Sequence, residues 1–150
     1  MADTMQFDLV SPERSLVSVP VREVRMPGTE GDLTVMPGHA AAMVSLRPGI
    51  VTVVDAQGNA IEFAVTGGFA EVNNESVSLL AERGHARADL TQELYNEMLR
   101  DAHRKRRAAE QKATGTAGEE VVAAAVKMLS DMQALGTHVG LDPNQASFPD

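Results

Sequence analysis

Hydrophobic and polar residues alternate along the first 88 residues, in short runs that have the two-residue period of β-strands. The first run covers residues 5–10, and a second begins near residue 17. The apolar phase of this second run changes between Val21 and Val24, which predicts a β-bulge. Pro20 has no N–H to donate, so we expect the strand to lie at a free edge there or to carry the bulge.

Turn sequences separate the runs that follow. Pro-Gly pairs stand at residues 27–28, 37–38 and 48–49. Proline fixes φ for the second position of a turn, and glycine accepts the positive φ that comes next. Turns at this spacing with β-branched runs between them are typical of a sandwich or barrel, so we expect an antiparallel β-sandwich of about ten strands. The remaining predicted strands are 32–36, 42–46, 50–54, 61–65, 69–72 and 76–81.

The hydrophobic period changes at Asp89 to that of amphipathic helices. Asp89, with Gln92 three residues later, predicts a capped helix start, and the helix should reach about Ala113. The stretch 114–118 breaks it, and a second helix is predicted at Glu119–Leu135, ended by Gly136. Two such helices joined by about five residues favour an antiparallel hairpin. The expected fold is therefore α+β, with a sandwich at 1–88, a two-helix hairpin at 89–135 and an irregular tail at 136–150.

Composition narrows the possible functions. The net charge of −8 argues against a general nucleic-acid or anionic-membrane surface. The chain has no cysteine, which excludes disulfides, thiolate catalysis and thiolate metal sites. The first residues lack the basic and apolar regions of a signal peptide. No apolar run approaches the roughly 18–20 residues that span a bilayer, so we expect membrane association only through partners.

Motifs of catalysis are missing from the sequence. It contains no phosphate loop, dinucleotide fingerprint, zinc-protease helix or serine elbow. The four histidines have no ligand spacing; they are His39, His85, His103 and His138. The glycines at 67–68 precede no predicted helix, so we interpret them as a tight turn or bulge rather than a phosphate cradle. Phe69 is expected to be a core or interface anchor. We therefore expect no catalytic residue, cofactor or metal.

Three groups of polar residues have two interpretations each on sequence alone. Glu30 and Asp32 are either an exposed contact loop or acidic residues that favour turns. His39 is either functional or a turn histidine bonded to a nearby carbonyl. A basic run in the first helix is either a binding surface or a solvated helix face; it consists of Arg100, Arg104, Lys105, Arg106 and Arg107.

Several motifs occur in an order that resembles one known family. They are FDLVSPE at 7–13, GTEGDLTVMPGHA at 28–40, LRPG at 46–49, VTGGFAEV at 65–72 and LLAERGHARADL at 79–90. In this order they resemble the epsilon subunit of the bacterial F-type, proton-translocating ATP synthase. The resemblance is strong from about residue 5 to 90 and looser beyond.

The resemblance implies a central-stalk (rotor) subunit that couples rotation of the membrane c-ring to the gamma shaft. It implies a peripheral protein on the cytoplasmic face of the bacterial inner membrane, without direct membrane insertion. Matching positions give Thr29, Glu30 and Asp32 as c-ring contacts. Those on the face toward the gamma subunit are Ser11, His39 and Val44.

The hairpin of the family can reach the alpha/beta catalytic head and restrain ATP hydrolysis, which would make the basic run the head contact. Inhibiting members tend to carry basic residues on the second helix too. Here that helix has Lys127 against Glu119, Glu120 and Asp131, so we expect at most weak inhibition. Members that bind ATP have a D-x-x-R-A pattern where this chain has Asp89 followed by Leu-Thr-Gln-Glu, so no nucleotide binding is expected.

Two other classes of protein fit the same features. One is a free-standing β-sandwich adaptor whose hairpin binds a helical partner. The other is a small ligand-sensing module, whose melting temperature would rise with its ligand.

Overall fold

The computed structural model describes residues 4–112 and 114–144. The chain forms two compact units, Met1–Asp89 and Leu90–Asp150, and each is described by itself. In the described part of the first unit there are nine strands: β1 (Met5–Val10), β2 (Ser15–Gly28), β3 (Gly31–Val35), β4 (Ala42–Leu46), β5 (Gly49–Asp55), β6 (Ala60–Val65), β7 (Gly68–Val72), β8 (Ser76–Ala81) and β9 (Gly84–Ala86). A short 3-10 turn, η1 (Arg87–Asp89), follows them. The second unit contains α1 (Gln92–Lys112) and α2 (Gly115–Val139).

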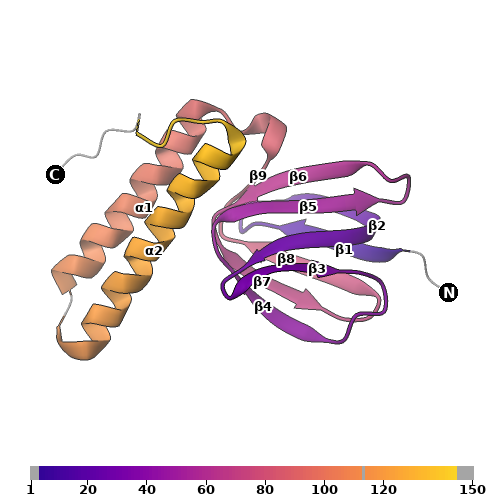
Figure 1. Ribbon diagram of the computed structural model, residues 1–150, viewed down its shortest axis with the longest axis horizontal. Coiled ribbons are helices and arrows are strands. Elements are labelled where there is room, and N and C mark those ends of the chain that lie inside the picture. The colour runs from indigo at the N-terminus through magenta and orange to yellow at the C-terminus, as the bar shows by residue number, and fades with distance from the viewer. Residues whose placement is uncertain (1–3, 113, 145–150) are drawn as a thin grey trace. The chain divides into compact units, whose positions relative to one another are not determined.

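The strands are hydrogen-bonded in the order β1-β8-β7-β4-β2-β5-β6-β9, and β3 pairs with β2. Strand β2 is 14 residues long and pairs with strands of both layers of the sandwich (Figure 1). Its first half pairs with β1, and its second half pairs with β5 and β3. Strand β1 also pairs with β8, so β1, β8, β7, β4 and β2 close on themselves. The predicted sandwich is confirmed, with one parallel pair, β1 and β8, in a pattern that is otherwise antiparallel.

The core of the sandwich follows the alternation of the sequence. Phe7 and Leu9 are fully buried on one face of β1. The pairing of β2 with β5 shifts register between Val21 and Glu23, and the buried positions pass from Val21 to Val24. The predicted bulge is therefore confirmed. On one side Pro20 pairs with β1, and on the other side the pairing of β2 with β5 begins only at Val21. The N–H that Pro20 lacks would therefore have no partner in β5, and no hydrogen bond of that ladder is lost.

The link between β6 and β7 also follows prediction. Gly67 and Gly68 both have φ near +135°, at +137° and +133°. A Cβ on Gly68 would lie 1.9 Å from the carbonyl oxygen of Leu80. Glycine is therefore required at Gly68 for two reasons, its backbone conformation and the close approach of β8. The interpretation of these glycines as a tight strand connection is correct.

The first helix begins later than predicted. Asp89 ends η1, and Thr91 caps α1 by accepting the Leu94 N–H at 3.1 Å. The side chain of Gln92 does not answer a cap at Asp89. It pairs with the backbone of Asp142, donating to the carbonyl and accepting the N–H, both at 2.8 Å. The capping prediction at Asp89 was wrong because Thr91 offers a hydroxyl at the right distance along the chain.

The second helix is longer at both ends than the predicted Glu119–Leu135. It begins at Gly115, so most of the predicted break at 114–118 is helical. It continues through Gly136, so the prediction that Gly136 ends the helix was wrong. Glycine is needed at this position for close packing, because a Cβ there would lie 2.0 Å from the Tyr95 hydroxyl oxygen. The helix ends at Gly140, whose φ of +83° gives a left-handed cap. Of the tail predicted at 136–150, residues 145–150 lie outside the described residues.

The helices of the second unit lie side by side and antiparallel, as predicted (Figure 1). The hydroxyl of Tyr95 near the start of α1 donates to the Met132 carbonyl near the end of α2, at 2.7 Å. Within the described residues, no helix is long and apolar enough to cross a membrane.

Candidate functional site

The predicted c-ring contacts lie at the tight turn between β2 and β3. Thr29 and Glu30 form its exposed tip, and Gly31, with φ of +133°, allows the chain to reverse. Asp32 follows in β3 and makes an ion pair with Arg47, between Oδ1 and Nη2 at 2.5 Å. The structure thus brings the three predicted residues together and adds Arg47. No local pattern in the sequence indicates this contact, because Arg47 lies 15 residues beyond Asp32.

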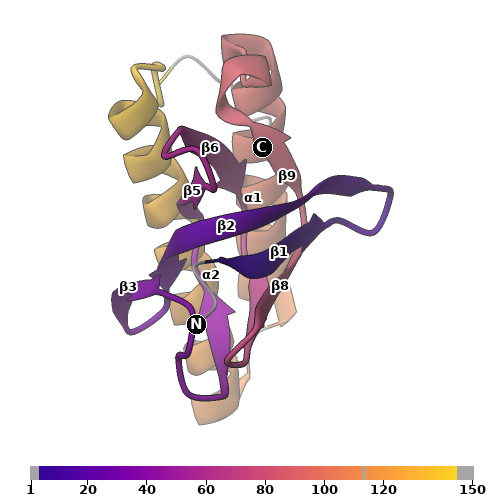
Figure 2. The same ribbon diagram turned by 90° about the vertical axis from the view of Figure 1, so that its right-hand side faces the viewer.

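The three predicted gamma contacts occupy separate places. Ser11 lies in the turn between β1 and β2, where its N–H donates to the Arg14 carbonyl at 2.9 Å. His39 lies between β3 and β4, and its Nδ1 is 2.8 Å from the Ala40 carbonyl, which is the turn contact considered for it. Figure 2 shows these two connections apart, at the right and at the lower left. Val44, in β4, packs against the core.

An apolar patch on the outer face of the sheet lies between these connections. It consists of Met43, Phe69 and Leu80, which are 69%, 54% and 57% exposed. Phe69 in β7 pairs directly with Leu80 in β8, and Met43 in β4 is the diagonal neighbour of Phe69. Leu80 in turn pairs with Val10, the residue before Ser11. The patch therefore extends across three strands, β4, β7 and β8, and borders the end of β1.

Phe69 is thus an exposed residue and not part of the core, so the interface alternative predicted for it remains. The sequence could have indicated the whole patch. Phe69 and Leu80 each stand next to a buried residue of the same strand, and Met43 stands next to the partly buried Val44, so strand period places all three on the opposite face.

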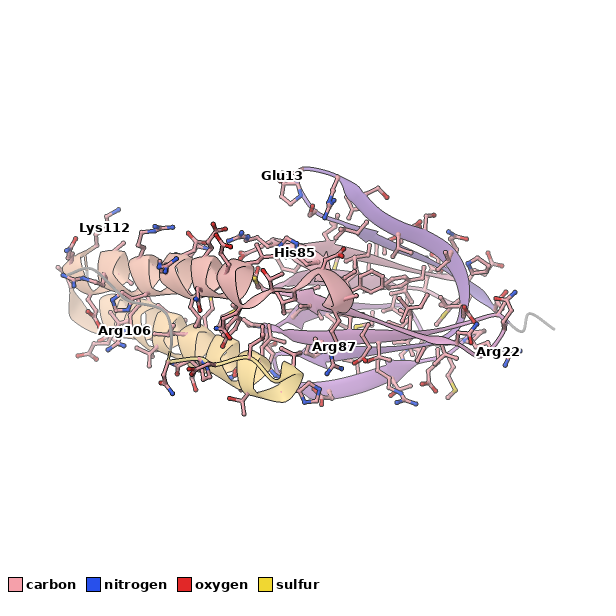
Figure 3. All side chains as sticks on the ribbon, turned by 90° about the horizontal axis from the view of Figure 1, so that it is seen from above. Glu13, Arg22, His85, Arg87, Arg106 and Lys112 are labelled. Atoms are coloured by element: carbon pink, nitrogen blue, oxygen red, sulfur yellow. The ribbon has the colours of Figure 1, made fainter. Side chains whose placement is uncertain are left out.

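The predicted head contacts lie in the middle of α1, where Figure 3 labels Arg106, and the same helix carries Lys112 at its end. Asp101 lies 3.4 Å from Arg104 and 3.6 Å from Lys105, and Glu110 lies 3.0 Å from Arg106. These exposed pairs add only a few tenths of a kcal/mol each to the helix, about 0.3–0.5. They place an acidic partner beside much of the basic run within its own helix.

The surface near β9 combines charged residues with one buried imidazole atom. Figure 3 shows His85 beside the turn that carries Glu13. Burial lowers the pKa of His85, and the nearby Arg83 and Arg14 lower it further, against the opposing effect of Asp89 and Glu13. Its Nε2 is buried without a hydrogen-bond partner among the described residues. The imidazole is therefore neutral near pH 7.

An ion pair joins η1 to β6. The guanidinium of Arg87, labelled in Figure 3, binds both carboxylate oxygens of Glu62, at 2.8 and 2.9 Å. Among the described residues, no three His, Cys, Asp or Glu side chains gather as they would around a metal ion. The surface features that stand out are the β2–β3 turn, the apolar patch and the basic run of α1.

Comparisons with known proteins agree with one another. Residues 4–86 match the family model for the ATP synthase delta/epsilon chain β-sandwich domain. The chain is 71% identical to the ATP synthase epsilon chain of Paracoccus denitrificans, over 99% of both chains. It is 60% identical to that of Rhodobacter capsulatus, over 94% of this chain and the whole of the other.

Solved structures share the fold at low identity. A chain of the Euglena gracilis mitochondrial ATP synthase, in a structure of OSCP, F1 and c-ring, superposes with a TM-score of 0.62 at 21% identity, covering 89% of this chain and 82% of the other. A chain of the central stalk and c-ring of the Tetrahymena thermophila mitochondrial enzyme gives 0.57 at 16% identity, covering 89% and 94%. The family model matches more than half of this chain, and the Paracoccus denitrificans relative matches nearly all of it at high identity. The chain therefore belongs to the ATP synthase epsilon-chain family.

Proposed function

We propose that this chain is a non-catalytic rotor subunit of the proton-translocating ATP synthase, which couples the membrane c-ring to the gamma subunit of the central shaft. It transmits torque across protein interfaces and makes or breaks no bonds. Membership of the epsilon-chain family supports the assignment of this chain to the ATP synthase complex. The two solved structures with the same fold come from assemblies that include a c-ring. The chain would act as a peripheral subunit on the cytoplasmic face of the bacterial inner membrane.

The observation that carries this proposal is the apolar patch of Met43, Phe69 and Leu80. More than half of each side chain is exposed on a sheet whose other face is packed. Large apolar side chains gathered at one place on a surface are typical of protein interfaces. The patch adjoins Ser11 through Val10, and its residue Met43 is the neighbour of Val44 in β4. We assign this face to the gamma subunit, with His39 at its border.

The β2–β3 turn is the part that we assign to the c-ring. Its tip is exposed and carries carboxylates, which would pair with basic groups on the polar surface of the ring. A turn held by β-strands on both sides is stiff enough to transmit a lateral force, because Gly28 and Gly31 are themselves paired.

Regulation by the hairpin is proposed to be weak. The basic run has acidic partners within α1, and Lys127, in the more acidic α2, pairs with Asp131 at 2.9 Å. Binding of this run to acidic loops of the catalytic head would have to break these pairs first. We therefore infer that the main role of the chain is to couple the c-ring to the gamma subunit, and that restraint of ATP hydrolysis is a minor role.

The experiment that tests the proposal measures binding to purified gamma subunit. Phe69→Ser and Leu80→Ser should each weaken binding by at least about tenfold, since central apolar anchors dominate interfaces. Val121→Ser removes a comparably exposed apolar side chain, 56% exposed in α2, and serves as the matched control that leaves binding unchanged. Unchanged affinity in both patch variants would remove the patch from the gamma interface. A parent chain that does not bind gamma would refute the rotor assignment itself.

A further inference from the structure

The segment that joins β4 to β5 holds the β2–β3 turn from the side. The Arg47 N–H donates to the Pro27 carbonyl at 2.9 Å, and the Thr29 N–H donates to the Ser45 carbonyl at 2.9 Å. Gly28 is also paired with Leu46 at the end of β4. The turn is thus tied by its backbone to a second strand as well as to its own hairpin partner.

The side chain of Arg47 adds two contacts that span the turn. Its Nη1 donates to the Gly28 carbonyl and its Nη2 to Asp32 Oδ1, each at 2.5 Å. Gly28 precedes the tip and Asp32 follows it, so one planar group holds both sides. A guanidinium can do this because its N–H donors are fixed in a fork, whereas a lysine ammonium offers a single point.

The two carboxylates of the turn are left in different situations. Asp32 remains 78% exposed, but its charge is opposed by the guanidinium of Arg47, whose side chain is 28% exposed. Glu30 is exposed at the tip, and the structure gives it no ion pair or side-chain hydrogen bond in the described part of the chain. Of the two acids, Glu30 alone presents an uncompensated negative charge.

We infer that Arg47 is a positioning residue for the ring contact: it pins Asp32 and the base of the turn, and so makes Glu30 the carboxylate that meets a cationic group of the partner. This inference rests on the proposed assignment of the turn to the c-ring. It divides the roles of two acids that the sequence treats alike.

The first test uses the free protein and needs no partner. Hydrogen exchange of the Thr29 amide, which donates to Ser45, reports how firmly the turn is held. Arg47→Gln should speed this exchange by at least about tenfold, and Arg47→Lys should restore little of the loss. Exchange that stays at the parent rate in Arg47→Gln would overturn the positioning role, whatever the turn contacts.

The second test uses the assembled synthase. The chain has no cysteine, so Thr29→Cys provides a single cross-linking site to the ring. We expect Glu30→Gln to lower the cross-linking yield and coupled ATP synthesis severalfold. We expect Asp32→Asn to add nothing once Arg47→Gln is present, because residues that act as a unit are non-additive. An equal loss from Asp32→Asn and Glu30→Gln in the Arg47→Gln background would overturn the division of roles.

A charge exchange separates positioning from folding. Asp32→Arg combined with Arg47→Asp restores an ion pair but not the donor to the Gly28 carbonyl. It should therefore recover part of the cross-linking that Arg47→Gln loses, while thermal melting stays near that of the parent. If cross-linking did not recover at all in this double variant, the ion pair between positions 32 and 47 would not position the turn. If Thr29→Cys gave no cross-link in the otherwise unchanged chain, the proposed ring contact would be refuted. The hydrogen-exchange measurement would still decide whether Arg47 positions the turn.

Discussion

One glycine sets how closely the two helices approach each other. Alanine usually stabilises a helix relative to glycine by about 0.8–1 kcal/mol. At Gly136, however, a Cβ would lie 2.0 Å from the Tyr95 hydroxyl oxygen, and overpacking of this kind costs about 1–3 kcal/mol. We therefore expect Gly136→Ala to lower the free energy of unfolding of the hairpin, as measured by Tyr95 fluorescence in urea. The chain has one tyrosine and no tryptophan, so the signal comes from the hairpin alone.

Ser130→Ala is the control for that measurement, because Ser130 is exposed on the same helix and meets no such ring. It should leave the hairpin unchanged or slightly more stable. If Gly136→Ala were as stable as Ser130→Ala, close packing of Tyr95 on α2 would be contradicted.

Tyr95 should also titrate abnormally. Burial, aided by the charge of Asp142 and opposed by a hydrogen bond from the Gly136 backbone, raises the pKa of Tyr95 to about 12 from the ordinary value of 10.0. The folded state therefore favours the protonated phenol. Its contribution to stability is fully present below pH 10 and is lost as the pH rises from 10 towards 12. Absorbance at the phenolate band should show a midpoint near 12 in the folded protein and near 10 in urea; a folded midpoint at 10 would contradict the burial.

At this scale the sequence predicted some side chains well and others poorly. Alternation correctly buried Phe7 and Leu9, because a strand period has only two phases. The same rule could not show that Arg47 meets Asp32, since that contact depends on how β4 returns beside β2. Val44 matched a family position, yet its neighbour Met43 is the side chain that faces outward.

The hairpin, as an element, is packed unevenly along its length. The buried residues of α1 end at Ala102, and those of α2 begin at Leu129. Beyond them, a hollow of about 480 Å³ lies between the helices near their connection, lined by small side chains such as Ala109. Thr114 precedes α2 without a side-chain cap. We expect amides at 104–112 and 115–126 to exchange at least about tenfold faster than those near Tyr95 and Met132.

Filling the hollow checks that explanation. Ala109→Leu adds apolar atoms there, and each buried CH₂ contributes about 0.8 kcal/mol. This variant should slow exchange in the connected ends and leave the Tyr95 region unchanged. Uniform exchange along the parent hairpin would mean that it opens as a single unit.

Element boundaries show why the strands were predicted better than the helix ends. Turns between strands carry local signals in Gly, Pro and Asn, but these signals place a turn only to within a few residues. Pro37 and Gly38 form a turn as predicted, with a φ of +88° at Gly38. The turn predictions at 27–28 and 48–49 were wrong, because residues 27–28 end β2 and residue 49 begins β5, and neither glycine has a positive φ. The helix ends were decided by contacts between distant residues instead. The side chain of Gln92 bonds the backbone of Asp142 instead of the expected cap. Gly136 lies within α2, where the absence of a side chain leaves room for the ring of Tyr95.

For the whole molecule, the division into two units leads to a truncation experiment. The sandwich has its own core within residues 1–89, so a chain ended after Asp89 should retain its β circular dichroism and its binding to gamma. If regulation by the hairpin is weak, this chain and the full chain should affect ATP hydrolysis by the catalytic head almost equally. Loss of the β signal would contradict an independent sandwich. Suppression of hydrolysis by the full chain alone would make the hairpin inhibitory.

The double pairing of β1 has a consequence for how the chain is made. Gln6 pairs with Ser76, seventy residues later, and with Pro20 on its other side. Contacts so distant in sequence form late and slow folding. On the ribosome, the N-terminal strand must therefore wait beside an open strand edge until β8 has emerged. A nascent chain stalled before residue 80 is exposed to aggregation through that edge, whereas the hairpin can fold after the sandwich has closed.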